Sequence, residues 1–113
     1  MPRPQKSRKV CSMPKTCVFY PHGEFSKTVT LTVDEYESIR LIDKQGFSQE
    51  ECAGYMKVAR TTAQQIYNTA REKIATALVE GCAIKIEGGT YCLCSGEEKH
   101  CKCGGCEKHC KGI

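Results

Sequence analysis

The chain lacks long apolar segments. No stretch approaches the roughly 18 consecutive apolar residues of a membrane-spanning helix, so we expect no membrane-embedded part. The opening MPRPQKSRK also lacks the apolar region of a secretory signal. Together these absences predict a cytoplasmic protein, in a compartment where thiols stay reduced.

Acidic residues are missing from the first part of the chain. None precedes Glu24, whereas the basic residues there are Arg3, Lys6, Arg8, Lys9 and Lys15. We interpret residues 1–27 as a basic arm, extended when free. Its Arg3, Arg8 and Lys9 can lie along DNA phosphates or in the minor groove. The alternative is a solvated terminus with no partner.

Features typical of enzymes are also missing. The sequence contains no nucleophile–base arrangement, no phosphate-binding loop and no carboxylates paired at helical spacing. Cys103 and Cys106 have the spacing of a redox pair but lack the βαβ context that such a motif needs. We therefore expect no enzyme activity.

The segment FSQEECAGYMKVARTTAQQIY, residues 47–67, predicts two helices around a tight turn. Ser48 and Glu51 have the spacing of a capping box, which marks the start of the first helix. That helix should end around Lys57, and the second should begin near Arg60. Two helices around a turn of three or four residues form a helix-turn-helix, whose second helix enters the major groove of DNA.

The second helix separates into an apolar and a polar face. Its apolar stripe recurs at helical spacing through Ala63, Ile66, Tyr67, Ala70, Ile74, Ala77 and Leu78. The candidate DNA-contacting residues lie elsewhere on the helix, at Arg60, Thr61, Thr62, Gln64, Gln65 and Asn68. Amides and hydroxyls can read base edges, whereas the carboxylate of Glu72 should mark the limit of contact. The alternative is an ordinary amphipathic helix with a solvated polar face.

The remaining pattern completes a mainly α fold. Residues 28–31 are extended in propensity, and Thr32 should cap a helix that ends near Gly46. Residues 83–87 and 90–93 predict a hairpin around Gly88 and Gly89. We therefore expect a basic arm (1–27), a three-helix helix-turn-helix domain of the winged-helix or sigma region 4 type (28–81), a small β-hairpin (82–94) and a Cys-rich metal-binding tail (95–113).

Ten cysteines are unusual for a reducing compartment. Cys52 and Cys82 fit buried apolar positions. The tail has too few large apolar groups for a core, and closely spaced Cys and His favour a metal site over disulfides. The candidate ligands are Cys92, Cys94, His100, Cys101, Cys103, Cys106, His109 and Cys110, with Cys11 and Cys17 as further candidates.

The spacing leaves the metal open. Cys103 and Cys106 have the separation of a zinc knuckle, so zinc is our first interpretation. The run from Cys101 to Cys110 approaches, without matching, the spacing of a bacterial iron–sulfur cluster. Thiolates would also accept Cu(I). A tail of reactive thiols without metal is the remaining alternative.

The stretch from Leu31 to Gly89 resembles a family of small predicted DNA-binding proteins known as domain of unknown function one-three-four. The opening MPRP, with Arg8, Pro14, Phe19 and Pro21, is also similar to that family. The resemblance implies DNA binding through a helix-turn-helix similar to region 4 of sigma factors, with Arg60, Thr61, Thr62, Gln64 and Gln65 on its contact stretch. It also implies RNA polymerase or a metal-cofactor protein as further partners.

Two functions follow from these features. The first is a metal-containing or metal-responsive transcriptional regulator that binds double-stranded DNA. We expect it to act as a homodimer, because one helix-turn-helix reads few bases alone. The second is a metal-binding accessory protein for cofactor handling, whose helical domain docks a protein partner.

Overall fold

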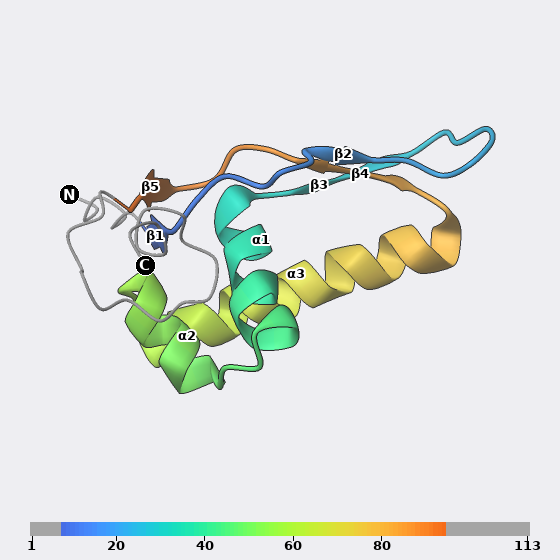
Figure 1. Cartoon of the computed structure of the whole chain (residues 1–113). Coiled ribbons are helices and arrows are strands. Elements are labelled where there is room, and N and C mark those ends of the chain that lie inside the picture. Colours follow the sequence, from blue (N-terminus) through green and yellow to red (C-terminus); the bar gives the residue numbers. More distant parts are fainter. Residues whose placement is uncertain (1–7, 95–113) are drawn as a thin grey trace, which may run out of the picture.

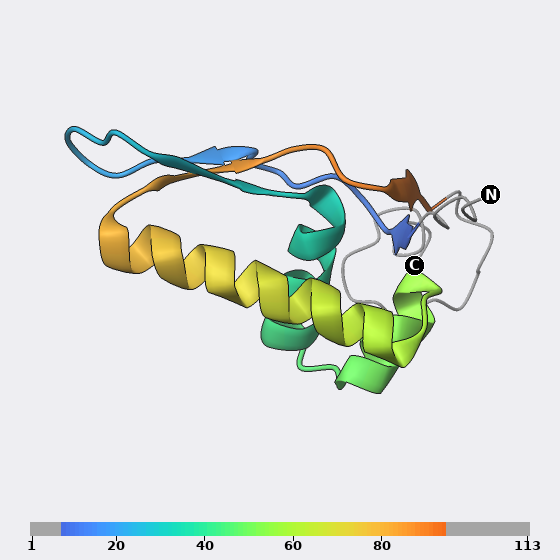
Figure 2. The same cartoon turned by 180° about the vertical axis from the view of Figure 1, so that it is seen from behind.

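The computed structural model describes residues 8–94. In chain order its elements are β1 (Arg8–Val10), β2 (Val18–Phe19), β3 (Thr28–Leu31), α1 (Val33–Ile39), the π-helical turn η1 (Arg40–Lys44), α2 (Gln49–Met56), α3 (Arg60–Glu80), β4 (Ala83–Ile86) and β5 (Tyr91–Leu93). The strands lie along one side of the molecule and α3 along the other, with α1 between them (Figures 1 and 2). None of the helices in this part of the chain is long and apolar enough to cross a membrane.

The helix starts follow the local sequence. Thr32 and Ser48 each accept a hydrogen bond from the amide three residues on, and the carboxylates of Glu35 and Glu51 each accept one from the amide of the cap residue. Both capping boxes satisfy amides that a helix start leaves without partners. The three predicted helices are therefore present, and Gly46 and Gly81 follow the first and third of them with positive φ.

The prediction of a mainly α fold is wrong, because the molecule is a mixed α/β structure with two small sheets. In the first sheet, β1 and β5 pair in parallel, with Arg8 opposite Tyr91. In the second, β4 is central, antiparallel to β2 and parallel to β3. Residues 8–10 and 18–19 of the predicted arm are therefore strands of the fold.

The predicted hairpin is also wrong. Ile84 pairs with Phe19 and Val29, and not with a residue of 90–93 as a hairpin would require. Gly88 and Gly89 do have positive φ, 76° and 95°, but they carry the chain past the start of α1, where the Val33 amide donates to the Gly88 carbonyl at 3.0 Å. Because β2 and β3 occupy both edges of β4, β5 continues past it to β1.

Two apolar clusters hold the elements together. One lies under the helix-turn-helix and includes Leu41, Cys52, Met56 and Ala63, each fully buried. The other joins the sheets to α1 and α3 through residues such as Val10, Val33 and Ala70. Burying a side chain of leucine size stabilises the fold by about 1.5–3 kcal/mol. As predicted, Cys52 and Cys82 are buried apolar residues, at 0% and 7% exposure.

Candidate nucleic-acid interface

The helix-turn-helix occupies the predicted residues. Helix α2 ends at Lys57, which has a left-handed conformation (φ 58°), and α3 starts after Ala59. A left-handed backbone conformation costs a residue with a Cβ about 1–2 kcal/mol, so the sharp turn at Lys57 destabilises the chain locally. Cys52, Ala53 and Met56 of α2 pack with Ala63 and Ile66 of α3 in one cluster. The packing fixes which side of α3 faces outward.

The predicted polar face of α3 is on the outside. Arg60, Thr61, Gln64, Gln65 and Asn68 are exposed, and Thr62 is half-buried. The first five positions of the predicted apolar stripe, Ala63 to Ile74, face inward with Ala77. Leu78 does not, because it is 76% exposed. The N-terminal half of α3 thus offers hydroxyl, amide and guanidinium groups that its packing does not use.

The start of α3 favours a negative partner. Ala59 makes no side-chain cap, and the first turn contains no acidic residue. The amides at the start of a helix carry partial positive charge, and Arg60 adds a full charge beside them. Helices α1 and α2 differ, since each has two acidic residues in its first turn.

A shallow depression of about 300 Å³ lies beside the polar face. Thr62, Gln65 and Thr69 of α3 line it on one side, and Arg8 and Thr90 line it from the β1 and β5 segments. No local pattern points to Thr90 at this place, because the β1 and β5 segments meet α3 only in the folded chain. Gln65 therefore lies between open solvent and this depression.

Two predicted DNA contacts in the arm are engaged by the fold. Lys9 is 8% exposed, and Arg8 places Nη1 3.6 Å from Oδ2 of the buried Asp34. Neither side chain is placed as an extended arm would place it. Arg3 lies outside the described residues.

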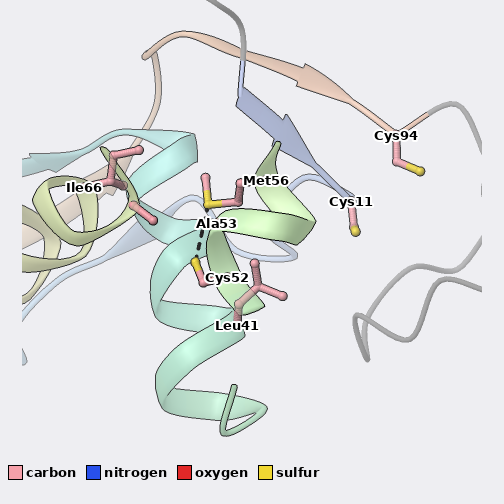
Figure 3. Packing of buried hydrophobic residues seen from close by; sticks show 8 residues of the cluster. Cys11, Leu41, Cys52, Ala53, Met56, Ile66 and Cys94 are labelled. Atoms are coloured by element: carbon pink, nitrogen blue, oxygen red, sulfur yellow. Dashed lines mark hydrogen bonds between the residues drawn. The ribbon is translucent and has the colours of Figure 1, made fainter. Parts of the chain in front are cut away.

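The candidate metal ligands fall into separate places. Cys94 and Cys11 are buried in the cluster under the helix-turn-helix, and Figure 3 shows them on the same side of it, away from Cys52 and Met56. Cys92 and Cys17 are exposed, and the Cys17 carbonyl accepts from the Ile86 amide in the other sheet. Outside the described residues lie His100, Cys101, Cys103, Cys106, His109 and Cys110.

The fold positions Cys11 and Cys94 from two directions. The Cys94 amide donates to the Val10 carbonyl at 2.8 Å, which extends the β1–β5 register. The Cys11 amide donates to Oε2 of Glu37 at 3.2 Å, and Arg40 donates to the same buried carboxylate. Within residues 8–94, no three His, Cys, Asp or Glu side chains gather closely enough to hold a metal ion.

The thiol of Cys52 is suited to packing and not to ligation. Burial, with a smaller contribution from Glu37, raises its pKa to about 12. Its Sγ lies 3.7 Å from Sδ of Met56 (Figure 3). A metal ligand must be a thiolate, so Cys52 is a core residue.

The family model described as "Protein of unknown function DUF134" matches residues 1–94. A UPF0251 protein of Desulfitobacterium hafniense (strain Y51) is 56% identical over 99 residues, which cover 85% of this chain and 79% of that protein. A UPF0251 protein of Thermoanaerobacter sp. (strain X514) is 49% identical over 102 residues, which cover 88% of this chain and 90% of that protein. No solved structure matches the chain. The chain belongs to the DUF134 family, as its sequence from MPRP to the helix-turn-helix led us to expect.

Proposed function

We propose that the protein binds double-stranded DNA through the N-terminal half of α3 and regulates transcription in the cytoplasm. One observation carries the proposal: packing uses only one face of α3 and leaves Arg60, Thr61, Gln64, Gln65 and Asn68 exposed on the other. Glutamine and asparagine can pair with adenine through two hydrogen bonds, and threonine can contact thymine.

The charges on this face of α3 favour a nucleic acid as the partner over a protein. The exposed face has Arg60 at its start and no carboxylate before Glu72. A phosphate beside the uncapped start of α3 would meet the partial positive charge of its amides. Lys57, exposed in the turn, adds a second cation at the same end of the helix.

The test is binding to duplex DNA selected from random sequences. We expect affinity that falls steeply with salt concentration, because phosphate contacts release counterions. Gln65→Ala should relax sequence choice at one base pair by about 1–3 kcal/mol. Uniform weakening on all sequences would show that Gln65 does not read bases.

A matched pair of threonines controls for general surface effects. Thr61 and Thr76 are both exposed on α3, but only Thr61 belongs to the proposed face. Thr61→Ala should weaken binding, whereas Thr76→Ala should leave it unchanged. Absence of DNA affinity at low salt in the metal-loaded protein would reject DNA binding and favour an accessory protein that docks a protein partner.

We also propose that the protein holds a metal ion, with zinc as the first candidate. Cys11 and Cys94 fit the role of two ligands because they directly follow the paired strands β1 and β5 and lie in one buried cluster. Cys94 also leads directly into the Cys-rich segment. A tetrahedral zinc site needs four ligands, so two would come from residues 95–113. Such an ion would tie that segment to the fold.

A further inference from the structure

The molecule has an apolar groove between its sheet and its helices. The groove has a volume of about 890 Å³ and is lined by Phe19, Ile84 and Ile86 from the sheet, Tyr36 and Ile39 from α1, and Ile74 from α3. Phe19 is 54% exposed at this surface. An open apolar surface of this kind on a small protein commonly marks a binding site.

A second apolar surface lies just beyond the groove on α3. Ala75, Leu78 and Val79 are all exposed and have the i, i+3, i+4 spacing of one helical face. Leu78 and Val79 are 76% and 85% exposed, although both are large aliphatic side chains. We call these three residues the α3 ridge. The ridge starts one residue after Ile74, which lines the groove.

We propose that the groove receives the α3 ridge of a second copy of this chain, in a two-fold dimer. Because groove and ridge are neighbours on α3, a two-fold axis close to Ile74 brings each ridge over the groove of the other copy. In such an interface the same patch is used twice, so one chain must supply both complementary shapes. This chain has both.

The charges at the two surfaces are complementary. Lys15 and Lys44 line the groove and are exposed. The last turn of α3 has no basic residue and ends with Glu80, whose Oε1 lies 3.7 Å from Lys27 Nζ at the surface. The carbonyls that end a helix add partial negative charge. An α3 end entering the groove therefore meets cations.

The test is the mass of the full-length protein in solution, measured by sedimentation equilibrium with reductant present. We expect a dimer. Leu78→Glu with Val79→Glu should raise the dimer dissociation constant by about 100-fold or more, because each charge enters the interface twice. The variant should keep the circular dichroism spectrum of the parent, since both side chains are exposed in the monomer. Its melting temperature should fall to that of the dissociated parent, because association stabilises the folded state.

Thr69→Glu is the matched control, because Thr69 is exposed on the same helix but lies well before the ridge. It should remain dimeric. Phe19→Glu tests the groove from its exposed edge and should be monomeric. Mixing Phe19→Glu with the ridge variant should not restore a tight dimer, because the mixed pair keeps only one of the two ridge–groove contacts.

A monomeric parent protein, or a ridge variant that still dimerises, would overturn the proposal. A mixture that associates as tightly as the parent protein would do so as well. None of these measurements uses DNA or depends on DNA binding, so the dimer and the proposed function can fail separately.

Discussion

The backbone amide of Cys94 donates a hydrogen bond to the carbonyl of Val10, with an N···O distance of 2.8 Å. This bond continues the parallel pairing of β1 and β5 and brings Cys94 beside Cys11, from opposite ends of the described chain. In the sequence, both are among many candidate metal ligands. Because they lie together in the fold, they are the two ligands that the described residues would contribute to a metal site.

Cys11→Ser and Cys94→Ser should each lower the affinity for zinc. We expect a loss of more than about 100-fold, because even residues that only support a metal ligand cost 10–100-fold when changed. The measurement is metal content and competition with a chelator, on protein prepared without oxygen.

Cys17→Ser is the control for this pair, because Cys17 is exposed and lies opposite Ile86 in the other sheet. It should retain the metal. Equal loss in all three variants, or normal zinc affinity in both Cys11 and Cys94 variants, would contradict the proposed ligand pair. Iron or copper in the purified protein would replace zinc as the metal.

The thiol of Cys52 should resist alkylation in the folded protein. Its pKa is raised to about 12, first by burial and then by Glu37, so the thiolate is scarce at pH 8–9. Cys17, which is exposed, should react first. Mass spectrometry of peptides after timed iodoacetamide treatment measures both rates. Similar rates at the two cysteines would show that Cys52 is accessible.

The same pKa predicts a change of stability with pH. The folded pKa of Cys52, about 12, lies above the ordinary value of 9.0, so folding favours the neutral thiol. Its contribution is complete below pH 9 and declines as the pH rises from 9 towards 12. Urea unfolding of the parent and of Cys52→Ala should therefore show a stability difference that shrinks between pH 8 and 10.5. A constant difference would contradict the raised pKa.

Gly89→Ala should destabilise the protein more than Gly88→Ala. Both glycines have positive φ, which costs alanine about 1–2 kcal/mol. A Cβ on Gly88 would meet open space, whereas one on Gly89 would lie 2.8 Å from Cβ of Thr32 and also overlap the Asp34 carboxylate. This crowding should add about 1–3 kcal/mol. Urea unfolding compares the variants, and equal losses would show that the chain moves away from α1 at little cost.

Ala59→Ser should stabilise the start of α3 by about 1 kcal/mol. Ala59 has the extended conformation of a cap residue (ψ 152°) but no side-chain oxygen to accept from α3 amides. Ser48→Ala, which removes the existing cap of α2, should destabilise by a similar amount. Thermal unfolding of the two variants measures both effects, and a neutral Ala59→Ser would show that the cap geometry is not met.

Local patterns were sufficient where near neighbours decide the outcome. The capping box of Ser48 and Glu51 joins residues three apart, and the left-handed Gly81 directly ends α3. The inward and outward faces of α3 followed from helical spacing up to Ile74. Leu78 departs from the pattern because periodicity says which side a residue lies on, but not whether another element covers that side.

Gly88 and Gly89 show where local patterns failed. Their conformational freedom was recognised, but the predicted hairpin assumed that neighbouring strands would pair. The edges of β4 are instead taken by β2 and β3, which come from the part assigned to a free arm and to the segment before α1. Which strands compete for an edge depends on contacts between distant segments.

The sequence by itself determined the family, the helix-turn-helix and the polar face of α3, because caps, turns and helical spacing act between residues a few positions apart. Only the tertiary structure decided that the arm enters two sheets, that Cys11 and Cys94 share one buried cluster, and that a groove lies next to an exposed ridge. Those features arise from hydrogen bonds and packing between segments far apart in the chain. A local sequence pattern does not show the free energy of such contacts.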